Sequence, residues 1–166
     1  MFVLGIDPGL TRCGYGAVER RGGDLRAVAA GVLRTPTDAE IPVRLAELQA
    51  GLRALLAELG PEVVAVERLF FQSNVRTAMS VGQASGVVLA EAVAAGCEVV
   101  QYTPNEVKSA VTGSGSAAKE QVQPMVQAIL RLEHTPRPPD AADALALALT
   151  HHARAPLAAR IGGAAR

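Results

Sequence analysis

The sequence predicts an α/β domain built on a five-stranded mixed sheet flanked by helices. Three observations lead to this fold class. Short apolar or β-branched runs recur along the chain, the first three follow one another with only tight turns between them, and the later ones alternate with segments of helical periodicity. Strands joined by turns pair antiparallel and strands joined through helices pair parallel, so one sheet should contain both kinds of pairing.

Length and composition fit a single domain. The chain has 166 residues, of which 49% are hydrophobic and 19% are charged, enough to bury a core. We expect the domain to cover residues 1–153, and the Ala, Gly and Arg residues of 154–166 to form a flexible tail. No apolar run reaches the ~20 residues of a membrane span, and the N-terminus lacks a signal-peptide pattern, so we expect a cytoplasmic protein with no membrane partner.

The first predicted strand ends in an acid. Residues 2–7 are apolar up to Asp7, and Pro8-Gly9 terminates the strand, which fixes Asp7 at its carboxyl end. Residues 13–19 and 25–33 are predicted to be two further strands joined near Gly22-Gly23, which completes a three-stranded meander.

A helix and a fourth strand repeat this design. Apolar residues at alternating steps of 3 and 4 predict a one-sided helix from Ile41 to Leu59, ended by Gly60-Pro61. The β-branched run 63–66 then forms a strand that closes on Glu67.

The next segments alternate between helix and strand. Residues 74–95 predict a long helix whose small side chains allow close approach of the sheet or of a second subunit. Residues 98–102 give the fifth strand, and Pro104 opens a short helix. In a further helix over 119–132, Pro124 is expected to kink the helix or to delay its start.

The last predicted helix carries two acids. Alanine content and the prolines before it favour helix over strand for residues 140–149. Asp140 and Asp143, three residues apart, share a face near the helix N-terminus. We interpret His151 and His152 as residues at the C-terminal end of this helix and not as metal ligands.

Four carboxylates thus lie at the ends of predicted elements: Asp7, Glu67, Asp140 and Asp143. Ligands of α/β sheets gather at the carboxyl ends of strands. Oxygen donors without a His/Cys cluster favour Mg²⁺ or Mn²⁺ over zinc, and two such ions ~3.5 to 4 Å apart suit phosphodiester hydrolysis. Taken singly, each acid also has an ordinary explanation as a turn cap, a solvated strand end or an exposed helix start.

The remaining polar composition is less specific. Cys13 and Cys97 belong to no CxxC or Cys/His cluster and are expected to be small buried residues. The formal charge is zero, and the part of the chain up to Gln83 and the part after it each contain equal numbers of basic and acidic residues, so there is no gross basic tail. An acidic pocket can still offset a basic groove, so a DNA partner remains compatible. Among 16 basic residues the only lysines are Lys108 and Lys119, which flank the Gly/Ser loop 113–116 and suit contacts to phosphate.

Several motifs together carry a resemblance to a known family: Leu4-Gly-Ile-Asp7-Pro-Gly9, Gly14-Tyr-Gly16, Val66-Glu67 followed by Phe70, and Asp140-Ala-Ala-Asp143-Ala-Leu. The chain resembles RuvC-type Holliday-junction resolvases over roughly residues 3 to 152. The resemblance implies an RNase H-like fold, a homodimer, Mg²⁺- or Mn²⁺-dependent paired nicking of four-way junction DNA, and a branch-migration motor as partner.

Carried over by position, the resemblance makes the four acids the metal-binding catalytic set and puts Lys108 and Lys119 near the DNA backbone. It also points to Phe70 as an exposed aromatic residue that stacks on a base at the junction centre. From the sequence alone, a loop phenylalanine that anchors its own loop is an equal alternative, and Phe71 is as good a candidate for the exposed position.

We therefore expect a dimeric endonuclease that resolves four-way junctions during recombination and repair. One alternative is an RNase H-like nuclease acting on structured RNA, whose relatives share the opening Gly-Ile-Asp pattern. Another is a non-cleaving junction-binding protein, which the four retained carboxylates argue against. Actin-like ATP-binding proteins also begin with Gly-x-Asp-x-Gly, but they need two such domains and a longer chain.

Overall fold

The structure is a computed structural model that describes residues 1–68 and 75–163, with side chains for 1–68 and 78–155. It contains a five-stranded sheet in the order β3-β2-β1-β4-β5. The elements follow one another as β1 Phe2–Asp7, β2 Arg12–Arg21, β3 Asp24–Arg34, α1 Ile41–Leu59, β4 Val63–Glu67, α2 Val75–Ala94, β5 Glu98–Tyr102, α3 Pro104–Thr112, α4 Lys119–Ile129 and α5 Pro139–Gly163. The predicted fold class is confirmed, and all five strands lie where the sequence indicates them.

Strand β1 lies at the centre of the sheet, where the two kinds of pairing meet. It pairs antiparallel with β2 and parallel with β4, and β4 pairs parallel with β5. Its last pair with β4 is Ile6 with Val66, so Asp7 and Glu67, the next residue of each strand, lie at the same edge of the sheet. Beyond them, the Arg68 backbone N–H donates to the Tyr102 carbonyl at 2.7 Å and keeps β5 in line.

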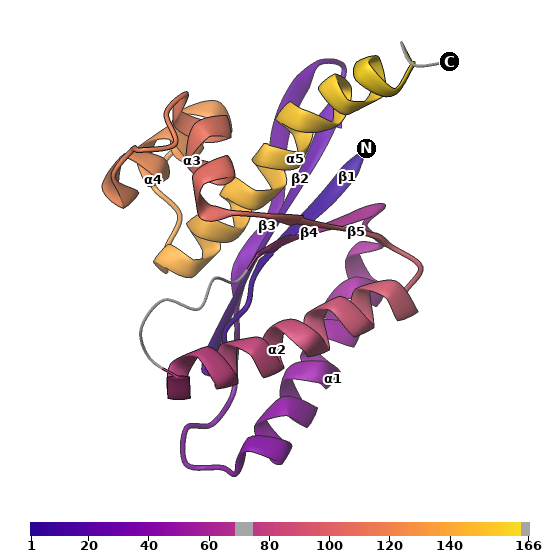
Figure 1. Cartoon of the computed structure of the whole chain (residues 1–166), viewed down its shortest axis with the longest axis vertical. Helices are drawn as coiled ribbons and strands as arrows, with labels where there is room; N and C mark the ends of the chain where they lie inside the picture. The colour runs from indigo at the N-terminus through magenta and orange to yellow at the C-terminus, as the bar shows by residue number, and fades with distance from the viewer. Residues whose placement is uncertain (69–74, 164–166) are drawn as a thin grey trace.

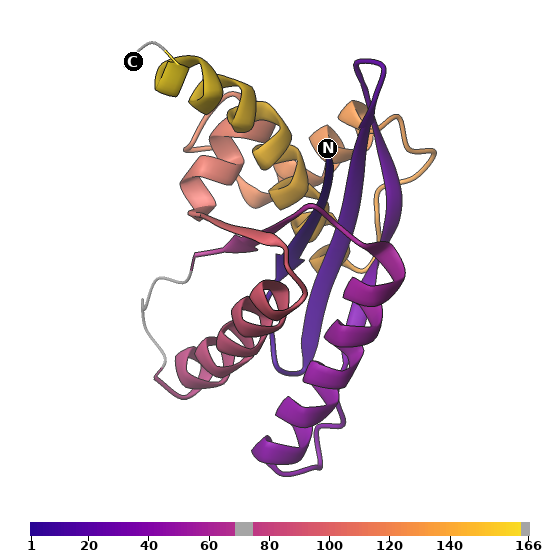
Figure 2. The same cartoon turned by 90° about the vertical axis from the view of Figure 1, so that its right-hand side faces the viewer.

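Helices cover both faces of the sheet. Figures 1 and 2 show α3, α4 and α5 on one face and α1 with α2 on the other. Two separate apolar clusters fill these layers, because alternate residues of a strand point to opposite faces. Val3 and Val63 pack toward α5, whereas Leu4 and Val64 pack toward α1 and α2.

Helix α5 lies directly on the backbone of β1 and β2. A Cβ atom at Gly5 would collide with the Ala144 carbonyl, and one at Gly14 would collide with the Asp140 carbonyl. A Cβ atom at Gly16 would lie 2.6 Å from the Leu145 nitrogen. Glycine is therefore required wherever α5 crosses these strands, and the crossing brings the acidic start of α5 to the end of β1.

The helices on the other face match their predicted bounds. Helix α1 ends at Gly60, which adopts a left-handed conformation with φ 58°, as expected of a C-terminal glycine. Its buried residues are Leu48, Leu52, Leu55 and Leu56, so Leu56 joins the predicted stripe. On α2, Ala84 and Ser85 are buried, whereas a Cβ atom at Gly82 or Gly86 would meet nothing within 4 Å.

Of the two effects expected of Pro124, a kink or a delayed start, the structure excludes the second. Helix α4 starts at Lys119 and continues through Pro124, so its start is not delayed. Pro124 lies on the exposed side of α4, where water can satisfy the carbonyl that its missing N–H leaves free.

Helix α5 continues to Gly163, well past His151 and His152. These histidines therefore do not end the helix. His151 Nδ1 lies 2.9 Å from the Tyr102 hydroxyl, and His152 Nε2 donates to the Val18 carbonyl at 3.0 Å. Burial lowers the pKa of both rings. Residues 154–163 are helical, and the division into a domain and a flexible tail stays a prediction.

Two further sequence expectations concern cysteines and membranes. Both cysteines are free; Cys13 is buried and Cys97 is half-buried. Burial raises the pKa of the Cys13 thiol to about 12, which makes it an unreactive core residue. Within residues 1–68 and 75–163, we find no helix that has both the length and the apolar character to cross a membrane.

Candidate active site

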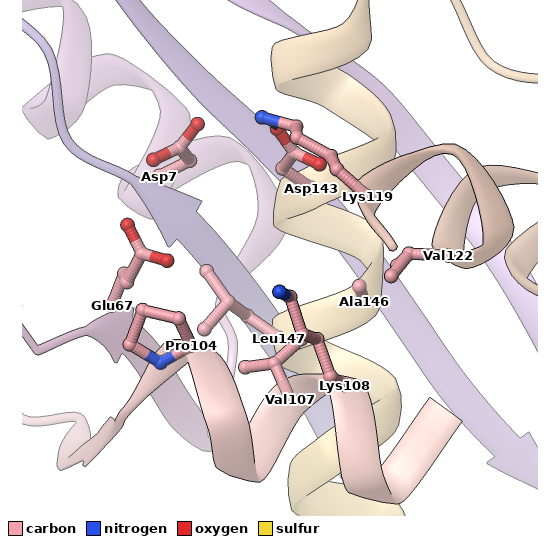
Figure 3. Close-up of a pocket in the computed structure, with 10 residues that line it drawn as sticks. All are labelled: Asp7, Glu67, Pro104, Val107, Lys108, Lys119, Val122, Asp143, Ala146 and Leu147. Atoms are coloured by element: carbon pink, nitrogen blue, oxygen red, sulfur yellow. Dashed lines mark ion pairs between the residues drawn. The ribbon is translucent and has the colours of Figure 1, made fainter. Parts of the chain in front are cut away.

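A pocket of about 190 Å³ opens at the edge of the sheet where β1 and β4 end. Figure 3 shows Asp7 and Glu67 on one side of it, Asp143 and Lys119 on another, and Lys108 between them and α3. Its floor is apolar and consists of Pro104, Val107, Val122, Ala146 and Leu147. The structure therefore brings together three of the four predicted acids and both predicted lysines in one pocket.

Asp7 has the most perturbed acid–base behaviour in this pocket. Burial is the main cause, and repulsion from Glu67 and Asp143 adds to it, so that the pKa of Asp7 rises to about 7 despite the opposing effect of Lys119. No hydrogen bond from a described residue lowers the pKa of Asp7 and so offsets the effect of burial. Near neutral pH, Asp7 therefore exists as a mixture of acid and carboxylate, and a bound cation would favour the carboxylate.

Glu67 behaves in the same way on the neighbouring strand. Its pKa is raised by burial first and by Asp143 second, whereas Lys119 lowers it. The parallel backbone pairing of β1 with β4 holds Glu67 beside Asp7, and this needs no direct contact between the two side chains. Two partly buried acids that repel each other are typical of a functional site.

Lys119 contributes positive charge to the same space. Its Nζ atom lies 2.7 Å from Asp143 Oδ2, and the hydrogen bond to Asp143 raises the pKa of this lysine. Lys119 is the first residue of α4 and Asp143 lies in the first turns of α5. The pair therefore joins two helices at the rim of the pocket.

Asp140 is the acid that the pocket lining does not include. Its Oδ2 atom lies 3.4 Å from Arg12 Nε, yet this buried oxygen accepts no hydrogen bond from any described residue. A buried carboxylate oxygen without a donor is costly. Asp140 thus lies one turn from Asp143 with an oxygen that a bound cation would satisfy.

Lys108 reaches the pocket from α3, which is anchored at its start. The Glu106 N–H donates to Thr103 Oγ1 at 3.2 Å, and the Thr103 N–H donates to Glu106 Oε2 at 2.8 Å. Arg154 of α5 forms an ion pair with Glu106. This capping box holds the helix that presents Lys108 to the pocket.

The predicted DNA-stacking residue Phe70 and its neighbour Phe71 lie outside the described residues, so Phe70 stays a prediction.

Sequence reasoning missed the residues that hold the turn after Asp7. Thr35 Oγ1 donates to the Leu10 carbonyl at 2.6 Å. Arg44 donates from Nη2 to Thr11 Oγ1 at 2.7 Å and from Nε to Thr35 Oγ1 at 3.1 Å. These contacts join segments that are far apart in the chain, and no local pattern signals them. Arg12, on the far side of the same turn, was missed for the same reason.

The donor set fits a hard divalent cation. All four acids offer oxygen, and the pocket lining contains no Cys or His, which favours Mg²⁺ or Mn²⁺ over zinc. Within residues 1–68 and 75–163, no three His, Cys, Asp or Glu side chains stand close enough together to form a ready metal cage. The raised pKa of Asp7 and of Glu67 nevertheless indicates carboxylates that a cation would stabilise, and the Asp140 oxygen, although close to Arg12, has no hydrogen-bond donor among the described residues.

An acidic, lysine-flanked pocket at the end of the central strands of this sheet defines a nuclease of the RNase H-like class. The family model described as crossover junction endodeoxyribonuclease RuvC matches residues 3–151. The chain therefore belongs to the RuvC family of crossover junction endodeoxyribonucleases, and the resemblance noted in the sequence is confirmed.

Individual relatives agree with this assignment over nearly the whole chain. The crossover junction endodeoxyribonuclease RuvC of Moorella thermoacetica is 54% identical, covering 94% of this chain and 93% of the relative. The structure of Thermus thermophilus RuvC is similar with a TM-score of 0.87 and 42% identity over 95% of this chain and 97% of that one. The same protein in complex with Holliday junction substrate gives a TM-score of 0.85 and 40% identity over 95% and 96%.

Proposed function

We propose that this chain resolves four-way DNA junctions by hydrolysing one phosphodiester bond in each of two opposing strands, leaving ends that can be ligated. The observation that carries the proposal is the pocket in which Asp7, Glu67 and Asp143 meet Lys108 and Lys119. Carboxylates to hold cations and lysines to hold phosphate are the parts that phosphodiester hydrolysis requires. The junction-bound Thermus thermophilus relative supports four-way DNA as the substrate.

We assign Asp7, Glu67, Asp140 and Asp143 as the catalytic, metal-binding residues. Two Mg²⁺ or Mn²⁺ ions bound there would supply Lewis-acid stabilisation of the charge that develops on the phosphate. Asp7 and Glu67 would hold them from the sheet, and the two aspartates would hold them from α5. Lys108 and Lys119 would orient the backbone of the strand to be cut.

Water is the proposed nucleophile. The described residues that line the pocket include no Ser, Thr, Cys or Tyr side chain, so none of them offers a hydroxyl or thiol to form a covalent intermediate. The pKa of about 7 that Asp7 has without metal means that binding of a cation there competes with a proton near neutral pH.

The direct test compares cleavage of a mobile four-way junction, a linear duplex and a structured RNA in Mg²⁺ or Mn²⁺. We expect the wild-type protein to cut the junction and the Asp7→Asn variant to bind but not cut it. Equal cutting of junction and duplex would refute junction selectivity, and preferential cutting of RNA would favour the alternative nuclease. Junction binding without cleavage by the wild type in either metal would indicate a non-cleaving binding protein.

Paired nicking requires two sites, and we propose that the protein acts as a homodimer. The outward side of α2 supports this, because Met79 and Val93 are 61% and 65% exposed and Gly86 and Ala90 between them are exposed as well. An exposed stripe of apolar and small side chains suits close packing of a second copy. A strict monomer in size-exclusion chromatography with light scattering would contradict the dimer, and Gly86→Arg should convert a dimer to monomer.

The remaining partners rest on family membership. We propose a branch-migration motor as the cellular partner, action in the cytoplasm where the DNA substrate lies, and a flexible tail at 154–166 that follows the nuclease domain 1–153. Co-purification of the full chain with and without residues 154–166 would test whether the tail is needed for the motor. Cleavage by the truncated chain at the wild-type rate would agree with its position outside the domain.

A further inference from the structure

A second cavity lies next to the active-site pocket and shares Lys119 with it. It has a volume of about 640 Å³ and runs between the first half of α4 and the segment that leads into α5. Its lining consists of Lys119, Glu120, Gln123, Pro124, Thr135, Pro136, Arg137, Pro138 and Pro139. A DNA strand that approaches the active-site pocket past Lys119 would lie across this groove.

Arg137 is a positively charged residue of the groove without a partner among the described residues. Its side chain is exposed, and it forms no hydrogen bond or ion pair within residues 1–68 and 78–155. Lys119, by contrast, is already held by Asp143. The charged groups of the groove are Lys119, Arg137 and Glu120. Because Lys119 is paired with Asp143, Arg137 is the cation available to an anion.

The segment that carries Arg137 is held in place. Thr135 Oγ1 donates to Gln127 Oε1 at 2.7 Å, and Gln127 Nε2 donates to the carbonyls of Leu132 and Glu133 at 3.3 and 3.2 Å. Prolines on both sides of Arg137 restrict its backbone further. An arginine on a fixed backbone loses less conformational freedom when it binds a ligand than one on a loose loop.

We propose that this groove binds a phosphodiester of the cleaved strand adjacent to the scissile one, with Arg137 as its cationic contact. The guanidinium can donate two parallel hydrogen bonds to a phosphate, and Gln123 lines the same groove with a neutral donor. This inference rests on the proposed function and extends it, because it specifies the side on which the strand leaves the active site. Lys119 then lies between two consecutive phosphates of that strand.

The first test measures junction binding in the presence of a chelator over a range of salt concentrations. Loss of one phosphate contact should lower the slope of log affinity against log salt by about 1 in Arg137→Ala, while Arg137→Lys keeps most of the slope. Arg131→Ala is the matched control, because Arg131 is exposed and pairs with Asp24 outside the groove. Equal thermal stability of the Ala variants and the wild type shows that folding is intact. An unchanged slope in Arg137→Ala overturns the proposal.

The second test locates the phosphate. Single uncharged methylphosphonate linkages are placed at successive positions on either side of the cut site. The wild type should lose affinity at one linkage next to the scissile bond, and Arg137→Ala should be insensitive to that linkage while it responds normally to the others. If the loss at every linkage is the same in both proteins, Arg137 acts only through general electrostatic attraction, and the assignment to one phosphodiester is overturned.

These outcomes separate the groove from the proposed function. A wild type that cuts junctions selectively, with an unaffected Arg137→Ala variant, refutes the groove and keeps the function. A wild type that cuts junction and duplex alike, with a reduced salt slope in Arg137→Ala, refutes junction selectivity and keeps the phosphate contact.

Discussion

Lys119 Nζ lies 2.7 Å from Asp143 Oδ2, where α4 and α5 meet the carboxyl end of β1. This lysine lowers the pKa of both Asp7 and Glu67, and no other described cation does so. Lys108 lines the same pocket but does not contribute to either shift. The two lysines therefore have different electrostatic roles, although the sequence predicted the same role for both.

Replacement of Lys119 should change the pH profile of cleavage as well as its rate. In Lys119→Met, the pKa of Asp7 and Glu67 loses its downward contribution, so the pH at which cleavage is half-maximal should rise. The variant also loses the proposed charge-assisted hydrogen bond from Lys119 to the phosphate. Such a bond is worth about 1.5–3 kcal/mol, so the rate should decrease roughly 10- to 100-fold. Initial rates of junction cleavage across pH measure both effects.

Lys108→Met is the matched control for that experiment. It should weaken junction binding and reduce the salt dependence of binding, but leave the half-maximal pH where it is in the wild type. Equal pH shifts in the two variants would show that the electrostatic distinction between the lysines is wrong.

The pKa of Asp7, about 7, should make wild-type cleavage depend on pH near neutrality. A protonated carboxyl group does not hold a cation, so cleavage at low Mg²⁺ should fall as the pH drops below about 7. Higher Mg²⁺ competes with the proton and should move the midpoint to lower pH. Rates at two Mg²⁺ concentrations test this, and a midpoint that ignores Mg²⁺ would argue against Asp7 as a ligand.

The same shift should appear in the stability of the metal-free protein. The pKa of Asp7 is about 7 in the folded state and 3.8 for an unperturbed aspartate, so between these values the folded state binds the proton more tightly. The free energy of unfolding should therefore decrease as the pH rises through this window. Asp7→Asn removes the effect and should be more stable than the wild type at about pH 8, by up to about 4 kcal/mol.

Urea denaturation in a chelator at several pH values measures this difference, which should vanish near pH 4. The variant should also lose the stabilisation that Mg²⁺ gives the wild type. If Asp7→Asn is less stable than the wild type at about pH 8, the carboxylate is not a destabilising buried charge, and the case for a cation there weakens.

Much of the fold could be predicted because its signals are local. The steps of 3 and 4 between leucines predict α1, and the β-branched run before Glu67 predicts β4. Parallel pairing of β1 with β4 then puts Asp7 and Glu67 at one edge with no further information.

The rest depends on contacts between distant segments. Spacing of three residues puts Asp140 and Asp143 on one helix face. Which of them lines the pocket depends on how α5 packs on the sheet, and this packing puts Asp143 in the pocket and Asp140 beside Arg12. The glycines that permit this packing are separated from α5 by more than a hundred residues of sequence. The part of α5 after residue 153 was not predicted, because the Ala, Gly and Arg residues there show no helical periodicity.

The contact between Gly5 and Ala144 should make Gly5 intolerant of any side chain. In Gly5→Ala the new methyl group collides with the Ala144 carbonyl, so α5 has to move away from β1 and carries Asp143 with it. We expect a loss of about 3 kcal/mol in the free energy of unfolding, and a loss of cleavage larger than the unfolded fraction explains.

Gly51→Ala in α1 is the matched control, because its Cβ would lie 3.5 Å from Leu33 Cδ2, an ordinary contact distance. It should gain about 0.5–1 kcal/mol from higher helix propensity and cleave normally. Urea denaturation and cleavage assays compare the two variants. If both gain stability, α5 does not depend on a close backbone approach at Gly5.

Thr35 should support catalysis from a distance by holding the turn that follows Asp7. It is buried, with 6% of its surface exposed, and its hydroxyl donates to the Leu10 carbonyl at 2.6 Å. Thr35→Val keeps the shape but leaves that carbonyl and Arg44 Nε without their partner. This should cost about 1–3 kcal/mol and lower kcat with little change in junction affinity, because the turn positions Asp7 and not the phosphate contacts.

Thr35→Ser retains the hydroxyl and should restore both stability and kcat. Denaturation, single-turnover cleavage and binding assays separate these effects. Equal losses in the Ser and Val variants would attribute the role to the methyl group's packing, and an unchanged kcat in Thr35→Val would show that the turn needs no such support.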